Sequence, residues 1–236
     1  MHRSHVPIES WFLAAYLVAT RLPGISALQL QKELDLANYR SAWNLLRRLR
    51  SNMVTESLEK LTGTVRVYVT LLHEEARAGS RAPGAGGGDL VVGAVEVVTR
   101  RDARGRRREA PGRLKLAVIP DQRASTLEAF LMGNVEAGSK IRTNGRLSLS
   151  PKILTLYRHR IRAVGSPHEA ATRFPHIHKA FGELKSWLLV THRGVTPRYL
   201  QQYLDEFVFR FNRREVPMTA FRALLKNLVQ CPKATP

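Results

Sequence analysis

The hydrophobic period of this sequence changes once, near residue 60, from a helical repeat to strict alternation. Before that point apolar residues recur every three or four positions, as at Trp43, Leu46 and Leu49, which is typical of amphipathic helices. After it, residues 64–72 alternate apolar and polar side chains, which predicts a β-strand. The chain therefore combines an all-helical N-terminal domain, residues 1–57, with a part that contains a sheet.

The N-terminal domain has the outline of a helix-turn-helix. Ser26 and Gln29 form the sequence pattern of a capping box, which predicts the start of a second helix after the break at Pro23-Gly24. A short link leads to a third, arginine-rich helix at about residues 39–53. Two short helices of this kind fit a DNA-binding motif, and a three-helix interaction module with a solvated basic face is the alternative. The arginines expected to contact DNA here are Arg40, Arg47, Arg48 and Arg50.

The rest of the chain predicts an α/β fold. Further strands are expected at residues 90–98, 114–119 and 140–143, and helices at residues 126–134, at 171–190 and from 197 onward. Three successive strands, followed by helices mixed with another strand, indicate a mixed sheet with flanking helices, which we assign to residues 62–214. Residues 145–172 have too weak a pattern for an assignment, and residues 215–236 are expected to be a basic C-terminal tail.

The charge of the chain points to a polyanionic partner. Lys and Arg number 38 against 19 Asp and Glu, which gives a net charge of +19. Nucleic acid is the expected partner, although an anionic membrane surface or a place in a ribosome would give the same balance. An arginine-rich segment between two expected strands is either a solvated hairpin tip or a clamp on DNA phosphates. Its candidate contacts are Arg100, Arg101, Arg104, Arg106, Arg107 and Arg108, and a later helix ends in Arg210, Arg213 and Arg214.

Cysteine usage and hydropathy bound the remaining classes. The single cysteine, Cys231, excludes an internal disulfide framework and a cysteine-rich zinc module. No apolar run is long enough to cross a bilayer, and no signal-peptide pattern is visible. We therefore expect a cytoplasmic protein without a membrane partner.

Several motifs resemble the ISXO-type transposase domain of bacterial insertion sequences. They are residues 25–31 with Ala42-Trp43, residues 90–96 with 118–121, and the C-terminal run that ends in Glu206-Phe-Val-Phe-Arg-Phe-Asn-Arg-Arg214. The resemblance covers roughly residues 8–214 and implies a ribonuclease-H-like sheet with helices on both faces. It also implies an active site with two divalent metal ions, held by two Asp and a third residue, usually Glu or Asn, that cuts and joins DNA.

The sequence departs from the family pattern at the positions that the resemblance assigns to the metal ligands. Tyr68 stands at the position of the first Asp, and Asn144 stands at that of the second, between Thr143 and Gly145. The third position, seven residues before a helical Lys185, is occupied by His178. A phenol, an amide and an imidazole carry no formal negative charge near neutral pH. The alternative is that the alignment is misplaced, with Glu74 the nearest acid after the first strand.

These observations predict a DNA-binding protein of transposase origin that is inactive in DNA cleavage and strand transfer. The alternatives are an active transposase with an unusual metal site, and a basic protein that binds RNA or a transposase. No cofactor is expected, and Mg²⁺ or Mn²⁺ would be needed only if the site were functional. The expected partner is double-stranded DNA, with self-association or a full-length transposase as a further partner. The expected location is the bacterial cytoplasm, in association with the nucleoid.

Overall fold

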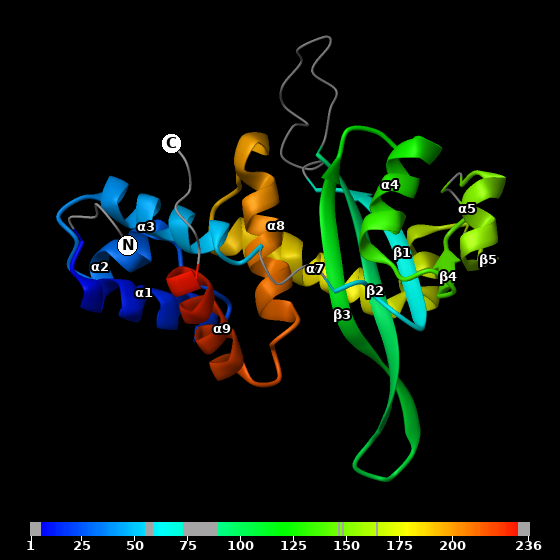
Figure 1. Cartoon of the computed structure of the whole chain (residues 1–236), viewed down its shortest axis with the longest axis horizontal. Coiled ribbons are helices and arrows are strands. Elements are labelled where there is room, and N and C mark those ends of the chain that lie inside the picture. The colour runs from blue at the N-terminus through cyan, green and yellow to red at the C-terminus, as the bar shows by residue number, and fades with distance from the viewer. Residues whose placement is uncertain are drawn as a thin grey trace. The chain divides into compact units, whose positions relative to one another are not determined.

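The chain folds into two compact units, which a computed structural model describes over residues 6–54, 59–72, 89–145, 147, 149–163 and 165–230 (Figure 1). The helical unit comprises Met1–Ser57 together with Ser186–Pro236, and the sheet unit comprises Leu58–Lys185. The sequence-based division into residues 1–57, 62–214 and 215–236 is therefore wrong at its C-terminal end. The last fifty or so residues belong with the first helices, because apolar side chains from both ends of the chain share one core.

A five-stranded sheet in the order β3-β2-β1-β4-β5 forms the centre of the sheet unit (Figure 1). Its strands are β1 (Thr64–Leu71), β2 (Leu90–Arg101), β3 (Arg107–Ile119), β4 (Lys140–Thr143) and β5 (Arg158–Ile161). β1, β2 and β3 pair antiparallel, whereas β4 pairs parallel with both β1 and β5. The predicted mixed sheet is confirmed, and β4 has the predicted bounds.

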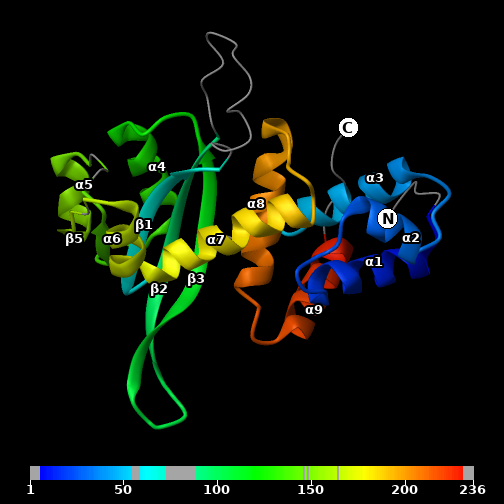
Figure 2. The same cartoon turned by 180° about the vertical axis from the view of Figure 1, so that it is seen from behind.

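Helices pack on both faces of this sheet. On one face, α4 (Ala124–Asn134) and α5 (Pro151–Leu156) bury apolar side chains against β1, β2 and β4. On the other face lies α7 (Pro175–Val190), which passes in front of the strands in Figure 2. Gly93 of β2 makes this packing close, because a Cβ atom there would lie 2.7 Å from Phe181 and 3.1 Å from Ile177.

The helix predicted for residues 171–190 is in fact two helices. α6 (Pro167–Arg173) ends at Phe174, and α7 begins at Pro175. Proline disfavours a helical backbone in the residue before it but fits the first turn of a new helix, which explains the break. Residues 145–172, whose pattern was too weak for an assignment, contain α5, β5 and most of α6.

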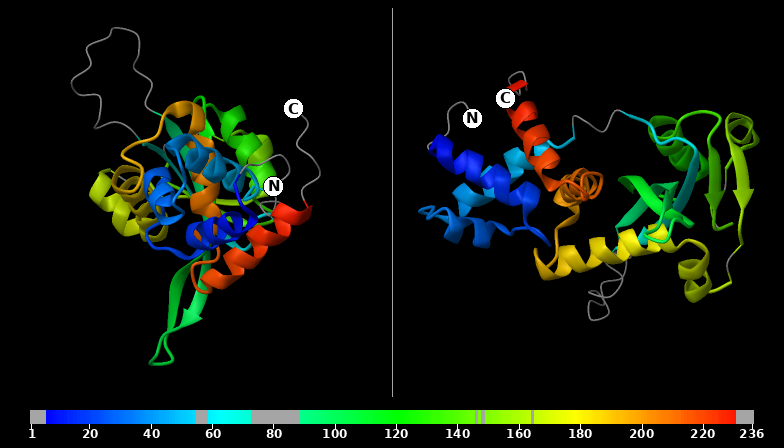
Figure 3. Two further views of the ribbon diagram at one scale, coloured as in Figure 1. Left: turned by 90° about the vertical axis from the view of Figure 1, so that its left-hand side faces the viewer. Right: turned by 90° about the horizontal axis from the view of Figure 1, so that it is seen from below.

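The helical unit consists of α1 (Ile8–Thr20), α2 (Ala27–Glu33), α3 (Tyr39–Ser51), α8 (Pro197–Phe211) and α9 (Pro217–Gln230), together with the end of α7. Its core joins Trp11, Leu30 and Leu46 from the N-terminal helices to Phe209 and Leu224 from the C-terminal ones. The prediction of a C-terminal tail is therefore wrong for residues 217–230. Figure 3 shows α9 beside α1, where Ala220 and Leu224 are buried.

Local signals at helix starts are confirmed. The Ser26 hydroxyl accepts a hydrogen bond from the Gln29 backbone N–H, and the Gln29 side chain accepts one from the Ser26 backbone N–H. Asn38 caps α3 by accepting a hydrogen bond from the Ser41 backbone N–H at 2.8 Å. None of the helices in the described parts of the chain combines the length and the apolar character needed to span a membrane.

Candidate functional site

Tyr68 lies on the face of the sheet that α7 covers. It is directly opposite Gly93 in the β1–β2 ladder, and its ring contacts the His178 ring with a centroid distance of 4.5 Å. The Phe181 ring, one turn further along α7, lies 6.4 Å from it. The absence of a side chain at Gly93 leaves room for Phe181 between the sheet and the helix. The structure therefore brings together Tyr68 and His178, two of the three predicted site residues.

The strand pairing brings Asn144 to the same end of the β1–β4 ladder as Tyr68. The last partner pair of β1 and β4 is Arg66 with Arg142, and Tyr68 and Asn144 each follow two residues later. Tyr68 is in the middle of β1, whereas Asn144 lies just past the end of β4. Asn144 is 4% exposed, so it is a buried group of the sheet edge rather than a surface residue.

His178 and Lys185 share the sheet unit's segment of α7, seven residues or about two turns apart. Burial, and next the positive charge of Lys185, lower the pKa of His178 below its ordinary value. The Nε2 atom of His178 is buried and has no hydrogen-bond partner within the described part of the chain. The imidazole is therefore neutral at pH 7, and Lys185 is exposed.

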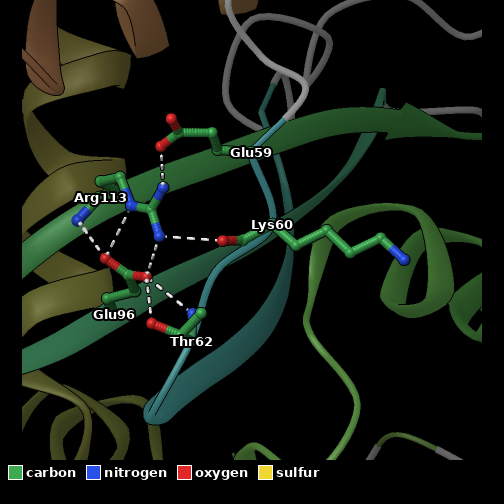
Figure 4. A network of polar contacts seen from close by, with 5 residues as sticks. All are labelled: Glu59, Lys60, Thr62, Glu96 and Arg113. Carbon is green, nitrogen blue, oxygen red and sulfur yellow. Dashed lines mark hydrogen bonds and ion pairs between the residues drawn. The ribbon is translucent and has the colours of Figure 1, made fainter.

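The one acid on the neighbouring strand β2, Glu96, is on the other face of the sheet. Glu96 of β2 is opposite Val65, whose side chain is in the core beneath α4. Its carboxylate accepts hydrogen bonds from the Arg113 side chain at 2.7 and 3.1 Å and from the Thr62 backbone N–H at 2.7 Å (Figure 4). Burial alone would raise the pKa of Glu96, but the hydrogen bonds from Arg113 and Thr62 hold it below its ordinary value. The Glu96 carboxylate on β2 is therefore held by hydrogen bonds from Arg113 on β3 and from Thr62 just before β1.

One carboxylate, Glu109 of β3, does reach the face that carries Tyr68. It forms an ion pair with Arg66 of β1 and lies 3.9 Å from the guanidinium of Arg142 on β4. Arg66 is two residues before Tyr68 and therefore on the same face of β1. Glu109 is thus neutralised by two arginines beside the candidate site. Sequence analysis missed Arg66 and Arg142, although the alternation along β1 and β4 already gave their face.

The candidate site does not offer the donors that a pair of divalent ions requires. Tyr68, Asn144 and His178 supply a phenol, an amide and a neutral imidazole, whereas Mg²⁺ is held in proteins mainly by carboxylate oxygens and water. Over the described ranges, no group of three or more His, Cys, Asp or Glu could hold a metal ion. Glu74, the alternative acid named from the sequence, lies outside the described residues.

Three of the four arginines predicted to contact DNA from α3 are exposed. Arg40, Arg47 and Arg48 lie on the solvent side of the helix, while Leu45, Leu46 and Leu49 are buried. The guanidinium of Arg47 lies 5.6 Å from the centre of the Trp43 ring, which holds it against an aromatic face. The structure thus gives α3 an exposed basic face. That α2 and α3 form a DNA-binding helix-turn-helix stays a prediction.

Arg50 and Arg210 are not available for DNA, contrary to the sequence-based prediction. Arg50 is 3% exposed, and its Nε donates a hydrogen bond of 2.6 Å to Glu206. Arg210 lies 3.6 Å from the same carboxylate and donates a hydrogen bond to the Arg21 carbonyl. Both arginines lie on the inward-facing sides of their helices. Together with Glu206 they form a buried ion network within the helical unit.

The end of α8 presents its other two arginines against aromatic rings. The guanidinium of Arg213 is 4.2 Å from the Phe209 ring centre, and that of Arg214 is 4.1 Å from the Phe211 ring centre. Each also donates a hydrogen bond to the backbone carbonyl of that same phenylalanine. Both side chains are therefore held along α8, and Arg214 is the exposed one.

The arginine-rich segment forms the end of a long β2–β3 hairpin, which extends beyond the other strands (Figure 1). Both strands are longer than predicted, so only residues 102–106 make the turn. Asp102 organises it, because its carboxylate accepts hydrogen bonds from the backbone N–H groups of Arg104 and Arg106 at 2.9 Å. Arg100 pairs with Arg108 across the strands, and Arg101 pairs with Arg107.

The six predicted hairpin arginines are all exposed. Like charges directly opposite each other on two strands repel. Asp102 offsets part of this repulsion, because its carboxylate also accepts side-chain hydrogen bonds from Arg106 at 3.2 Å and from Arg108 at 2.9 Å. The side chains concerned are Arg100, Arg101, Arg104, Arg106, Arg107 and Arg108.

The comparison with protein families agrees with the architecture. A model of the ISXO2-like transposase domain matches residues 60–212, well over half of the 236-residue chain. A comparison with curated proteins finds no significant match. The mixed five-stranded sheet with helices on both faces is consistent with the ribonuclease-H-like α/β fold implied by the resemblance. The chain therefore belongs to the family of ISXO2-like transposase domains.

Proposed function

We propose that this chain binds double-stranded DNA and does not carry out metal-dependent cleavage or strand transfer. One observation carries the second half of the proposal: Tyr68 and Asn144 each lie two residues past the last β1–β4 partner pair, and His178 packs against Tyr68. The family resemblance expects Asp at the positions of Tyr68 and Asn144, and Glu or Asn at that of His178. Two divalent ions brought there would lose water of hydration without anionic compensation.

The charges around the site add to this barrier. Arg66, on the same face as Tyr68, is buried with a 4% exposed surface, and Arg142 follows in the next strand. At an effective dielectric constant of about 20, two like unit charges about 4 Å apart repel each other by about 4 kcal/mol, and by less at larger separations. Cations near the metal positions therefore oppose the binding of further cations, and Glu109 neutralises only one of these two arginines.

Metal binding tests this half of the proposal. We expect calorimetry with Mn²⁺ to show no tight pair of ions on the unchanged chain, and labelled transposon-end duplexes to stay uncut in its presence. The double variant Tyr68→Asp, Asn144→Asp restores two hard anionic ligands and should gain measurable Mn²⁺ binding. The neutral variant Tyr68→Asn is the matched control and should gain none. Tight binding of two ions by the unchanged chain, or a cut duplex, would refute the proposed loss of activity.

DNA binding is supported by the net charge of +19, by the exposed arginines of α3 and by the opposed arginine pairs of the hairpin. Counterion release makes the affinity of such a surface fall steeply as salt rises. The variant Arg47→Ala, Arg48→Ala should weaken duplex binding, while its melting temperature stays within a few degrees of that of the unchanged chain. Fluorescence anisotropy with a labelled duplex at several salt concentrations measures both effects. A flat salt response would contradict the electrostatic argument.

If the α3 variant binds as tightly as the unchanged chain, recognition does not use this helix. The variant Arg101→Gln, Arg107→Gln, which removes one opposed pair of the hairpin, then identifies the hairpin as the contact. Its thermal stability should rise slightly, because the repulsion across the strands is relieved.

A further inference from the structure

The face of the sheet that carries Tyr68 is lined with basic side chains along β1, β4 and β5. Arg66 is the register partner of Arg142, and Arg142 is that of Arg160, so three arginines form a row across three strands. Side chains in register on adjacent strands, and those two residues apart on one strand, share a face. The same face therefore also carries Lys140 and Arg158, and Arg162 follows β5 at the next position of the same parity.

Most of this surface is open to solvent. Lys140, Arg158, Arg160 and Arg162 are exposed, and the side chain of Arg142 is 27% exposed. Two interstrand spacings of about 4.8 Å place the backbones of Arg66 and Arg160 roughly 10 Å apart. Among the described residues, Glu109 is the carboxylate that forms ion pairs with members of this group. The charge of the surface is therefore far from balanced.

Arg66 is the buried member of the row, and it is incompletely satisfied. Its Nη2 bonds Glu109, whereas its Nε and Nη1 are buried and, over the described ranges, have no hydrogen-bond partner. Leaving donors of a buried cation without acceptors costs more than a neutral unmade hydrogen bond. His176 of α7 also has a buried Nε2 without a partner in the described chain. The two Arg66 nitrogens are donors that lack an acceptor within the described residues.

We propose that Arg66, Arg142, Arg160 and Arg162 bind a phosphate group of the DNA backbone, so that an anion site adjoins the position where a carboxylate pair would hold cations. The inference rests on the proposed DNA binding and names a surface for it. Guanidinium groups suit phosphate because their N–H donors form paired, charge-assisted hydrogen bonds with its oxygens. Arg142, Arg160 and Arg162, which are open to solvent, contact the phosphate directly. Arg66 lies buried below them and contributes its positive charge.

Glu109 is the internal competitor for this site. Its side chain is half exposed and bridges Arg66 and Arg142, the same groups that the phosphate requires. The variant Glu109→Gln removes the competing charge and should tighten duplex binding. The variant Glu183→Gln, at a half-exposed position on α7, removes the same charge elsewhere in the sheet unit and is its control. A larger gain for Glu109→Gln than for Glu183→Gln supports the site, and equal gains count against it.

The decisive test compares two double variants of the full chain. Arg142→Gln with Arg160→Gln removes two charges from the proposed site, whereas Arg123→Gln with Lys152→Gln removes two exposed charges from α5 and the start of α4, on the opposite face. Loss of two phosphate contacts should reduce the slope of log affinity against log salt by about two and the duplex affinity by about tenfold or more. The control should lose much less.

The outcomes separate this inference from the proposed function. If both double variants lose affinity equally while the unchanged chain binds duplex, the site is wrong and DNA binding stands. If the unchanged chain binds no duplex at any salt concentration, the proposed function and this inference both fail. Titration with inorganic phosphate is a separate arm: binding of phosphate that is lost with Arg142 and Arg160, without duplex binding, would overturn the assignment to DNA. Far-ultraviolet circular dichroism confirms that each variant is folded.

Discussion

Replacement of Glu206 by glutamine is expected to lower the free energy of unfolding of the helical unit by about 3–5 kcal/mol. Glu206 is fully buried, with its Oε2 2.6 Å from Arg50 and its Oε1 3.6 Å from Arg210. The amide has nearly the same shape but no charge, so two buried guanidinium groups lose their counterion. Because whole domains are stable by only about 5–15 kcal/mol, a change of this size removes a large part of the total.

Tryptophan fluorescence during denaturant unfolding reports on the helical unit, where this change is expected. The three tryptophans, Trp11, Trp43 and Trp187, all belong to the helical unit. The triple variant Arg50→Met, Glu206→Leu, Arg210→Met is the control, since replacing all three charged partners by apolar groups should recover most of the stability. Glu33→Gln, which breaks the exposed pair with Arg21, should cost less than about 1 kcal/mol. A similarly small effect for Glu206→Gln would contradict the buried network.

Acidification is expected to destabilise the helical unit through His192. Burial, opposed by the charge of Glu206, lowers the pKa of His192 from its ordinary 6.5 to about 4. The imidazole packs against the rings of Trp187 and Tyr203, and its Nε2 is buried without a partner in the described chain. The native state therefore prefers the neutral form, and protons bind more tightly to the unfolded chain.

The sign and size of the effect follow from linkage. The stabilisation is complete above the unfolded pKa of about 6.5 and is lost as the pH falls from there to about 4, a total of about 3 kcal/mol. The variant His192→Phe keeps an aromatic ring and should lose this part of the pH dependence. His168→Gln, on exposed α6, should keep it. The measurement is the unfolding midpoint at several pH values from 7 to 4, and parallel curves for His192→Phe and the unchanged chain would refute the role of His192.

Elements with a strong local signal were predictable from the sequence. The alternation at residues 64–72 predicted β1, and the Ser26–Gln29 pattern predicted the start of α2. The short strand β5 was not predicted because its sequence, Arg-His-Arg-Ile, shows no apolar alternation, and helix α5 was not predicted because six residues are too few to define a helical period. The C-terminal helix α9 was missed for another reason. Its flanking prolines and basic charge suggested a tail, whereas its apolar face is buried by helices almost two hundred residues away.

The candidate site was predictable in its residues but not in its surroundings. Tyr68, Asn144 and His178 came from motif positions; α7 places His178 against Tyr68, and Asn144 lies at the same end of the β1–β4 ladder. The row of Arg66, Arg142 and Arg160 needed the strand order, because nothing in the sequence says that β4 lies between β1 and β5. The burial of Arg50 and Arg210 likewise depended on Glu206, a partner 156 residues from Arg50.

The shared core of the helical unit has a consequence for protein synthesis. α1, α2 and α3 leave the ribosome before the sheet unit, yet the side chains of Phe209, Ala220 and Leu224 that complete their core are translated after it. At about 5–20 residues per second, the nascent helices wait on the order of ten seconds or more for those partners. The whole sheet unit is made during that interval, so a transcript that stops before α9 would release a polypeptide with the apolar side of α1 uncovered, a substrate for chaperones and proteases.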